Sequence, residues 1–236
     1  MNTFDRFARR TRLCLGVLAW CLGLVACSSA PTPAWQLDAR AEWQNFSDAY
    51  LRGDEAAAQS ALARARRALA STGKADLLAR AELLRCAVRV ASLAFDHCAA
   101  YQPYAFAAAA PELAYAAYLN AAWQDVDVAL LPKAHQALAQ QLKTQADAGS
   151  KREPLDGLSE PLARLVAAGV LLQSGRLTAQ DAALAVQTAS DQGWRKPLLA
   201  WLALQRQQAL AAGLDAQAQA LQQRMELILS GAQVPP

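Results

Sequence analysis

Apolar residues recur at intervals of three and four positions along almost the whole chain after Pro33. This spacing places apolar side chains on one face of a helix. It predicts helices at 34–52, 54–71, 74–91, 111–123, 128–147, 159–174, 178–192, 196–212 and 215–229. The segment 92–110 is less regular, and Pro103 and Pro111 act as stops within it. The pattern therefore predicts an all-α fold.

The composition agrees with this fold class. The chain of 236 residues is rich in alanine and leucine but contains only 11 Gly and 10 Pro. Strong helix formers with few breakers argue against a β-sandwich or a β-barrel. An apolar content of 54% with 18% charged residues also excludes a disordered chain.

The spacing of the predicted helices indicates repeated pairs. Helices begin near residues 34, 74, 111, 159 and 196, about 37 to 48 residues apart, which is the length of two antiparallel helices with their turns. Gly53, Gly175 and Gly213 lie where three such hairpins turn, and glycine suits the left-handed end of a helix. We expect a right-handed solenoid of antiparallel helix hairpins over 34–230, with an internal break at 148–158 and a flexible tail at 231–236.

The first hairpin resembles a tetratricopeptide repeat. Gly53 in the turn is followed by Ala58, Leu62 and Ala65, at the spacing of the small and apolar residues on the second helix of that repeat. The resemblance is degenerate, because no window carries the full pattern and the spacing exceeds the usual 34 residues. It implies a tetratricopeptide-like domain rather than a regular array.

The first 26 residues have the plan of a secretory signal. Arg6, Arg9, Arg10 and Arg12 precede an apolar stretch at 13–26, which is shorter than the ~20 residues that a transmembrane helix needs. A permanent transmembrane anchor is the alternative interpretation. We expect residues 1–26 to be cleaved off.

The end of this segment resembles the lipobox of bacterial lipoproteins. It reads Leu24-Val25-Ala26-Cys27, and a run of small residues follows at 28–33. The resemblance implies that Cys27 carries the lipid, that 27–33 is a lipidated tether, and that the membrane is a partner through this lipid. Because Ser28 rather than aspartate follows the cysteine, it also implies an outer-membrane location, facing the periplasm.

The charge excludes two classes of partner. Removal of residues 1–26 leaves 19 basic and 19 acidic residues, so the mature chain is neutral. A neutral chain lacks the positive field on which binding to nucleic acid or to an anionic membrane surface depends. We expect the basic run Arg64, Arg66 and Arg67 to form a solvated helix face.

Two cysteines remain in the mature chain besides Cys27. In an oxidising compartment, Cys86 and Cys98 suggest a disulfide. On one continuous helix they would lie about 18 Å apart, so a bridge requires the helix to break between them, with Asp96 as a cap. Two separate buried thiols are the alternative.

The sequence offers little catalytic chemistry. His97 and His135 belong to no metal motif, and no nucleotide-binding or hydrolase signature is present. We interpret Asp125 and Asp127 as caps, and Ser159 as the cap of a helix with Glu160 and Pro161 in its first turn. We therefore expect no catalytic residue, metal or cofactor, and no enzyme activity.

Aromatic residues are the remaining candidates for a binding surface. The group comprises Tyr101, Tyr104, Tyr115 and Tyr118, and packing in the core is the alternative. Together these features favour a lipid-anchored, non-catalytic scaffold or adaptor that binds an unidentified protein partner in the cell envelope. A small-molecule or glycan-binding module is the alternative, and a cell-wall-processing enzyme is a weaker one.

Overall fold

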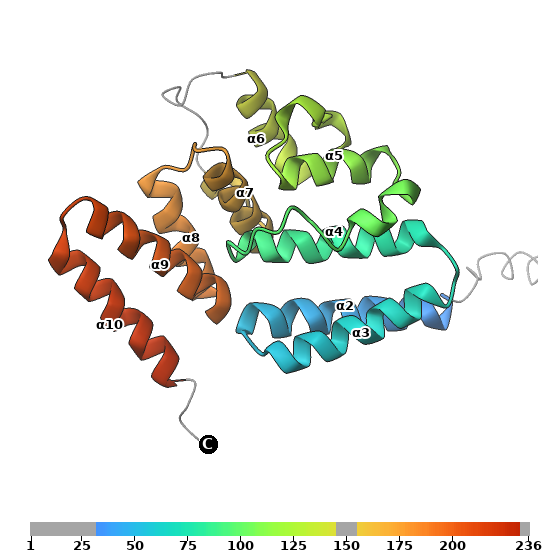
Figure 1. Ribbon diagram of the computed structural model, residues 1–236, viewed down its shortest axis with the longest axis horizontal. Helices are drawn as coiled ribbons and strands as arrows, with labels where there is room; N and C mark the ends of the chain where they lie inside the picture. Colours follow the sequence, from blue (N-terminus) through green and yellow to red (C-terminus); the bar gives the residue numbers. More distant parts are fainter. Residues whose placement is uncertain (1–31, 145–154, 232–236) are drawn as a thin grey trace, which may run out of the picture. The chain divides into compact units, whose positions relative to one another are not determined.

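The computed structural model describes residues 32–144 and 155–231, and every regular element in them is helical (Figure 1). The prediction of an all-α fold is confirmed. The α-helices are α2 (Ala34–Arg52), α3 (Glu55–Ala70), α4 (Ala75–Ala91), α5 (Ala110–Leu119), α6 (Lys133–Thr144), α7 (Pro161–Gln173), α8 (Ala179–Asp191), α9 (Arg195–Ala211) and α10 (Asp215–Gly231). Short 3-10 helices are η1 (Gln102–Ala107), η2 (Trp123–Asp125), η3 (Val128–Leu130) and η4 (Leu155–Gly157).

Three predicted features lie outside the described residues, wholly or in part. These are the signal segment 1–26 with Cys27, most of the break at 148–158, and most of the tail at 231–236. Within 32–144 and 155–231, no helix combines the length and the apolar character that crossing a membrane requires.

Two predicted helix boundaries are wrong. α5 ends at Leu119 instead of residue 123, because Ala121 takes a left-handed backbone conformation with φ +53°. α6 begins at Lys133 instead of residue 128. Leu131 precedes a proline and is extended, at φ −68° and ψ 156°, so a helix cannot run through it. The residues before it form η3, in which the carboxylate of Asp127 accepts a hydrogen bond from the N–H of Ala129.

The predicted glycine turns are confirmed. Gly53 has φ +80°, and the N–H of the next residue, Asp54, donates to the carbonyl of Ala49 at 2.9 Å, which closes α2. Gly175 and Gly213 have the same left-handed conformation and the same type of closing bond. Each of these turns joins two consecutive helices: α2 to α3, α7 to α8 and α9 to α10.

The buried apolar side chains form two clusters. The larger one draws on α4 to α9, and its largest fully buried members include Trp201, Tyr118 and Leu165. The smaller one joins α2 and α3 to Val88 of α4. Helix α10 contributes one buried residue, Ala218, and otherwise packs on α9 through half-buried side chains.

Helices α4 and α7 pack directly against each other, although α5 and α6 separate them in the sequence (Figure 1). The closest approach is at Gly169 of α7, where an added Cβ would lie 2.5 Å from the carbonyl oxygen of Val90. A glycine therefore permits this crossing. The contact also differs from an ideal solenoid, in which each hairpin touches only its neighbours.

Helix α9 connects to the N-terminal part of the chain. The indole N–H of Trp201 donates to the carbonyl of Ala91, at the end of α4, at 3.1 Å. The ammonium of Lys196 lies 2.8 Å from a carboxylate oxygen of Glu55 and 3.7 Å from the ring centroid of Tyr50. The first and the last thirds of the described chain are thus joined by direct contacts.

Candidate functional site

The disulfide between Cys86 and Cys98 is present, with the two Cα atoms 5.1 Å apart. As the sequence required, α4 ends between them, at Ala91. The carboxylate of Asp96 accepts a hydrogen bond from the N–H of Cys98 at 3.2 Å and pairs with Arg89 of α4 at 2.9 Å. Both cysteines are buried, so the bridge is a structural tie between α4 and the loop that follows.

The four tyrosines proposed as a surface do not share one location. Tyr101 and Tyr118 are buried in the core, in line with the alternative interpretation. Tyr104 and Tyr115 are half-buried and pack against the larger cluster. Burial, and then the charge of Glu112, raises the pKa of Tyr101 above its usual value. Among the four, Tyr115 lines a surface pocket in the part of the chain that is described.

A buried polar pair lies behind Tyr115. The hydroxyl of Tyr118 and Nδ1 of His135 are 3.1 Å apart, and the ring of Tyr115 stacks on both side chains. Burial lowers the pKa of His135 to about 4 and raises the pKa of Tyr118 well above its usual value. At neutral pH both groups are uncharged, which is how such a pair is accommodated in an apolar core.

The pocket beside Tyr115 is an apolar slot between α4, α5 and η3, which we call the α4–α5 slot. Its volume is about 300 Å³. Its lining consists of Arg80, Leu83, Leu84, Pro111, Glu112, Tyr115, Leu130, Leu131 and Pro132. Leu83 and Leu131 are buried, whereas Leu84 is 41% exposed. Burial, followed by the charge of Glu160, raises the pKa of Tyr115, so its ring is neutral.

One ion pair borders the slot. Nε and Nη2 of Arg80 each lie 2.8 Å from Oε1 of Glu112. The side chain of Arg80 is 63% exposed, whereas that of Glu112 is 11% exposed. The other oxygen of Glu112, Oε2, is covered and has no hydrogen-bond partner among the described residues. The slot therefore presents a cation to the solvent at its rim. Sequence reasoning missed this pair, because its members lie 32 residues apart and match no motif.

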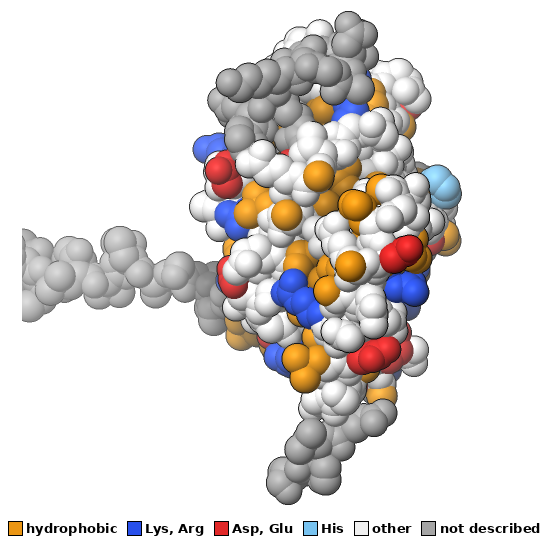
Figure 2. Space-filling view, turned by 90° about the vertical axis from the view of Figure 1, so that its left-hand side faces the viewer, with side chains coloured by type: hydrophobic (Ala, Val, Ile, Leu, Met, Phe, Trp, Pro, Cys, Tyr) orange, Lys and Arg blue, Asp and Glu red, His pale blue; other side chains and the backbone are white. Residues whose placement is uncertain are grey.

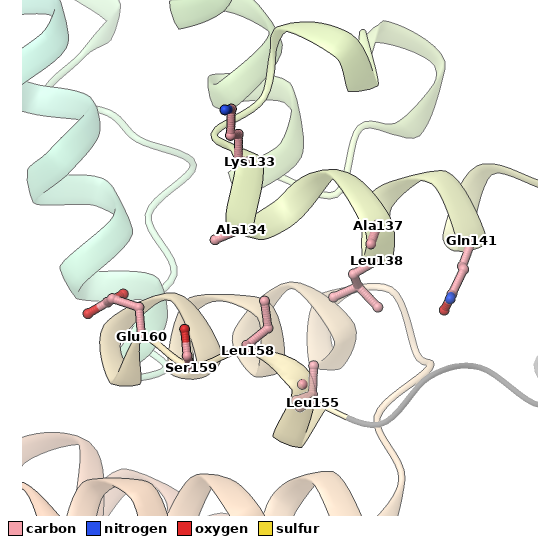
Figure 3. A pocket seen from close by; sticks show the side chains of 10 residues that line it. Lys133, Ala134, Ala137, Leu138, Gln141, Leu155, Leu158, Ser159 and Glu160 are labelled. Carbon is pink, nitrogen blue, oxygen red and sulfur yellow. The ribbon is translucent and has the colours of Figure 1, made fainter.

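A second cavity of about 270 Å³ lies between α6 and the segment 155–160, which contains η4 and precedes α7 (Figure 3). Half of its lining residues are alanine or leucine, and its polar groups do not converge, since Lys133 and Gln141 lie toward opposite ends of α6 (Figure 3). The nearby carboxylate of Glu160 accepts hydrogen bonds from the N–H groups of Leu162 and Ala163.

This contact corrects the prediction for the start of α7. Glu160, rather than Ser159, is the cap of the helix, and Pro161 is its first residue. The longer glutamate side chain reaches the free N–H groups of the first turn and brings negative charge to the positive end of the helix. Its carboxylate is occupied in capping.

The basic run on α3 is also more structured than expected. Arg64 pairs with Glu42 of α2 at 2.7 Å, and Arg66 pairs with the fully buried Glu82 of α4 at 2.5 Å. The hydrogen bond to Glu82 raises the pKa of Arg66. The side chains of Arg64 and Arg66 are 46% and 42% exposed, as expected for a solvated face, and both also connect neighbouring helices.

Other exposed apolar side chains are dispersed. On the side that carries α8 to α10, hydrophobic side chains form small groups with charged residues between them (Figure 2). Leu210, Leu214, Leu227 and Leu229 are exposed on α9, α10 and the turn between them. A cavity of about 340 Å³ lies between η4 and α8, but its lining includes Asp156 and Asp181 and no lysine or arginine, so it lacks the cation of the α4–α5 slot.

Among the described residues, no group of three or more His, Cys, Asp or Glu side chains is arranged to hold a metal ion. The α4–α5 slot is thus the candidate site that combines exposed apolar side chains with a defined charge. Comparisons with protein-family models, with curated proteins and with solved structures find no match for this chain.

Proposed function

We propose that this protein is a lipid-anchored outer-membrane lipoprotein that faces the periplasm and acts as a non-catalytic scaffold or adaptor for another envelope protein. The observation that carries the proposal is the α4–α5 slot. An exposed leucine, Leu84, and two exposed prolines, Pro111 and Pro132, line an apolar cavity that is open to solvent. Exposed apolar surface of this kind is typical of sites that bind other proteins.

The second part of this proposal concerns the location of the protein and its lipid anchor. The basic start, the apolar stretch and the box that ends at Cys27 support lipidation at that cysteine. The Cys86–Cys98 disulfide agrees with an oxidising compartment such as the periplasm. The paired helices α7–α8 and α9–α10 support a tetratricopeptide-like stacking of hairpins, whose right-handed solenoid arrangement belongs to the proposal.

A small-molecule or glycan-binding module is the second candidate. The cavity between α6 and α7 favours it, since it is more enclosed than the slot. Its volume lies at the lower limit of about 300 Å³ for ligand pockets. Because its polar groups are spread along the rim and Glu160 caps α7, the scaffold is better supported.

The scaffold is tested by photo-crosslinking in intact cells. A crosslinking amino acid replaces Leu84 in the slot or, as the matched control, the exposed Leu229 of α10. We expect a discrete protein adduct from position 84, its loss in the Cys27→Ser variant, and none from position 229. Adducts of equal yield from both positions, or none from position 84, would contradict the scaffold.

Lipidation is tested separately by the intact mass of the N-terminal peptide. We expect this peptide to begin at Cys27 and to carry acyl chains. A mature N-terminus at any other residue would exclude the lipoprotein assignment.

A further inference from the structure

We propose that the α4–α5 slot recognises the C-terminal end of a partner protein, with the last aliphatic side chain in the cavity and the terminal carboxylate on Arg80. This inference rests on the proposed scaffold function and names the chemistry of its partner. It follows from the shape of the slot, from the charge at its rim and from the way that charge is held in place.

The slot suits one or two aliphatic side chains. Its floor is formed by Leu83 and Leu131, which are buried, and its wall by the ring of Tyr115. Leu84 and Pro111 remain exposed at the edges, so an inserted aliphatic side chain would cover apolar surface that now faces water. The cavity is open and of about 300 Å³, which fits the end of a chain better than a whole small molecule.

The charge at the rim is positive on its solvent side. Arg80 uses Nε and Nη2 for a single oxygen of Glu112, which leaves its remaining N–H groups for another acceptor. Because Oε2 of Glu112 is covered, a ligand meets the guanidinium rather than the carboxylate. A carboxylate is one of the acceptors that a guanidinium binds strongly, through two parallel hydrogen bonds.

The same ion pair fixes the position of this cation. Glu112 stands in the first turn of α5 and is largely buried, so it holds Arg80 at the edge of the apolar cavity. A side chain that is already oriented loses less entropy when it binds. Asp76, one turn before Arg80 on α4, does not line the slot.

A free carboxylate next to an aliphatic group is found at every protein C-terminus that ends in Leu, Ile or Val. A fatty acid has the same two features, but it would need a long enclosed tunnel for its chain, and the slot is short and open. The geometry therefore favours a protein C-terminus.

The probe for the first experiment is a library of random heptapeptides with free C-termini, selected on the full chain purified in detergent. We expect aliphatic residues to be enriched at the last position. The best sequence is then synthesised as the free acid and as the C-terminal amide, and binding is measured by fluorescence polarisation. We expect at least tenfold weaker binding of the amide.

Arg80→Met should weaken binding of the acid at least tenfold and leave binding of the amide unchanged, because it removes the contact with the carboxylate alone. The matched control is Arg40→Met, a change of an exposed arginine on α2, which should leave both affinities unchanged. Circular dichroism checks that each variant remains folded.

Three results would overturn the inference: no enrichment relative to the Leu84→Asp variant, equal affinity of acid and amide, or binding of palmitate in the slot without binding of any peptide. A crosslink at position 84 in cells, together with equal binding of acid and amide, would support the scaffold function but contradict the recognition of a carboxylate. The absence of a crosslink from position 84 would contradict the proposed scaffold function itself.

Discussion

At the residue scale, His135 shows how the core restricts ionisation. Its ring packs against the rings of Tyr115 and Tyr118, with the hydroxyl of Tyr118 at hydrogen-bond distance. Burial is the cause that lowers its pKa to about 4, and no carboxylate among the described residues offsets it. The protein is therefore most stable when this ring is neutral.

We predict a loss of stability in mild acid that depends on His135. The unfolded chain binds a proton at this ring below pH 6.5, whereas the folded chain does so only near pH 4. The free energy of unfolding should fall by about 2 kcal/mol between pH 7 and pH 5. Urea unfolding at both pH values measures this difference.

The control for this prediction is the second histidine, His97, which is exposed. The His135→Gln variant should lose most of the pH dependence, and His97→Asn should retain it. The same dependence in both variants would show that other groups cause it.

Gly169 is the second residue whose identity the packing dictates. An added methyl group would lie 2.5 Å from the carbonyl oxygen and 2.8 Å from Cγ1 of Val90. The Gly169→Ala variant should therefore lose about 1–3 kcal/mol of unfolding free energy, because α4 and α7 must move apart. Intrinsic helix propensity alone predicts a gain of about 1 kcal/mol, so the sign of the change decides between the two effects.

The matched control is Ala203→Gly on the exposed face of α9, which should cost about 1 kcal/mol through propensity alone. Thermal or urea unfolding gives both values. A stabilised Gly169→Ala protein would show that the two helices do not approach as closely as described.

At the scale of the elements, periodicity predicted the helices well, because most of them bury one face and end in strong local signals. Gly53, Gly175 and Gly213 end helices at the expected positions. The prediction failed at the end of α5, where Ala121 adopts the same left-handed conformation without being glycine. Tertiary packing compensates for this conformation, and a single sequence does not reveal it.

The candidate site was less predictable than the helices. Tyr115 was included among the aromatic residues, but Arg80, Leu84 and Glu112 were not. These residues come from two helices that the fold brings together, and each has an ordinary surface or core interpretation on its own helix. The disulfide could be proposed from the sequence, because only two cysteines follow Cys27, but geometry set only the condition that the helix must break between them, and two separate thiols remained the alternative.

We predict that this disulfide stabilises the fold substantially. It closes a loop between residues 12 positions apart, for which chain entropy gives about 3 kcal/mol. The double variant Cys86→Ala with Cys98→Ala should therefore unfold at a lower urea concentration. Circular dichroism in urea measures the shift of the midpoint.

Alkylation provides the control for the disulfide. Without reductant, neither Cys86 nor Cys98 should be labelled, even after denaturation, and both should be labelled once a reductant is added. Labelling of denatured protein without reductant would contradict the bridge.

At the scale of the whole molecule, Trp201 connects parts of the chain that are far apart in sequence. It is fully buried, and its indole N–H bonds the carbonyl of Ala91, 110 residues earlier. The Trp201→Phe variant should lose about 2 kcal/mol of unfolding free energy, because it leaves a buried carbonyl without its donor and a small cavity. Urea unfolding followed by circular dichroism measures the loss.

Trp35→Phe is the control for this change, since Trp35 lies at the start of α2 and is only partly buried. Its effect should stay within about 0.5 kcal/mol. An equal loss in the two variants would mean that Trp201 has no special part in joining α9 to α4.

The contact between Lys196 and the first hairpin has a consequence for the order of folding. A ribosome adds residues from the N-terminus onward, so α2 and α3 are complete long before Lys196 exists. The two partners, Glu55 and Lys196, are 141 residues apart, and until the second is made, the ring of Tyr50 lacks the ammonium that covers it. The N-terminal hairpin therefore lacks this contact until Lys196 has been added, and in nascent chains stopped before residue 196 proteases should cut α2 and α3 more readily than in the complete chain.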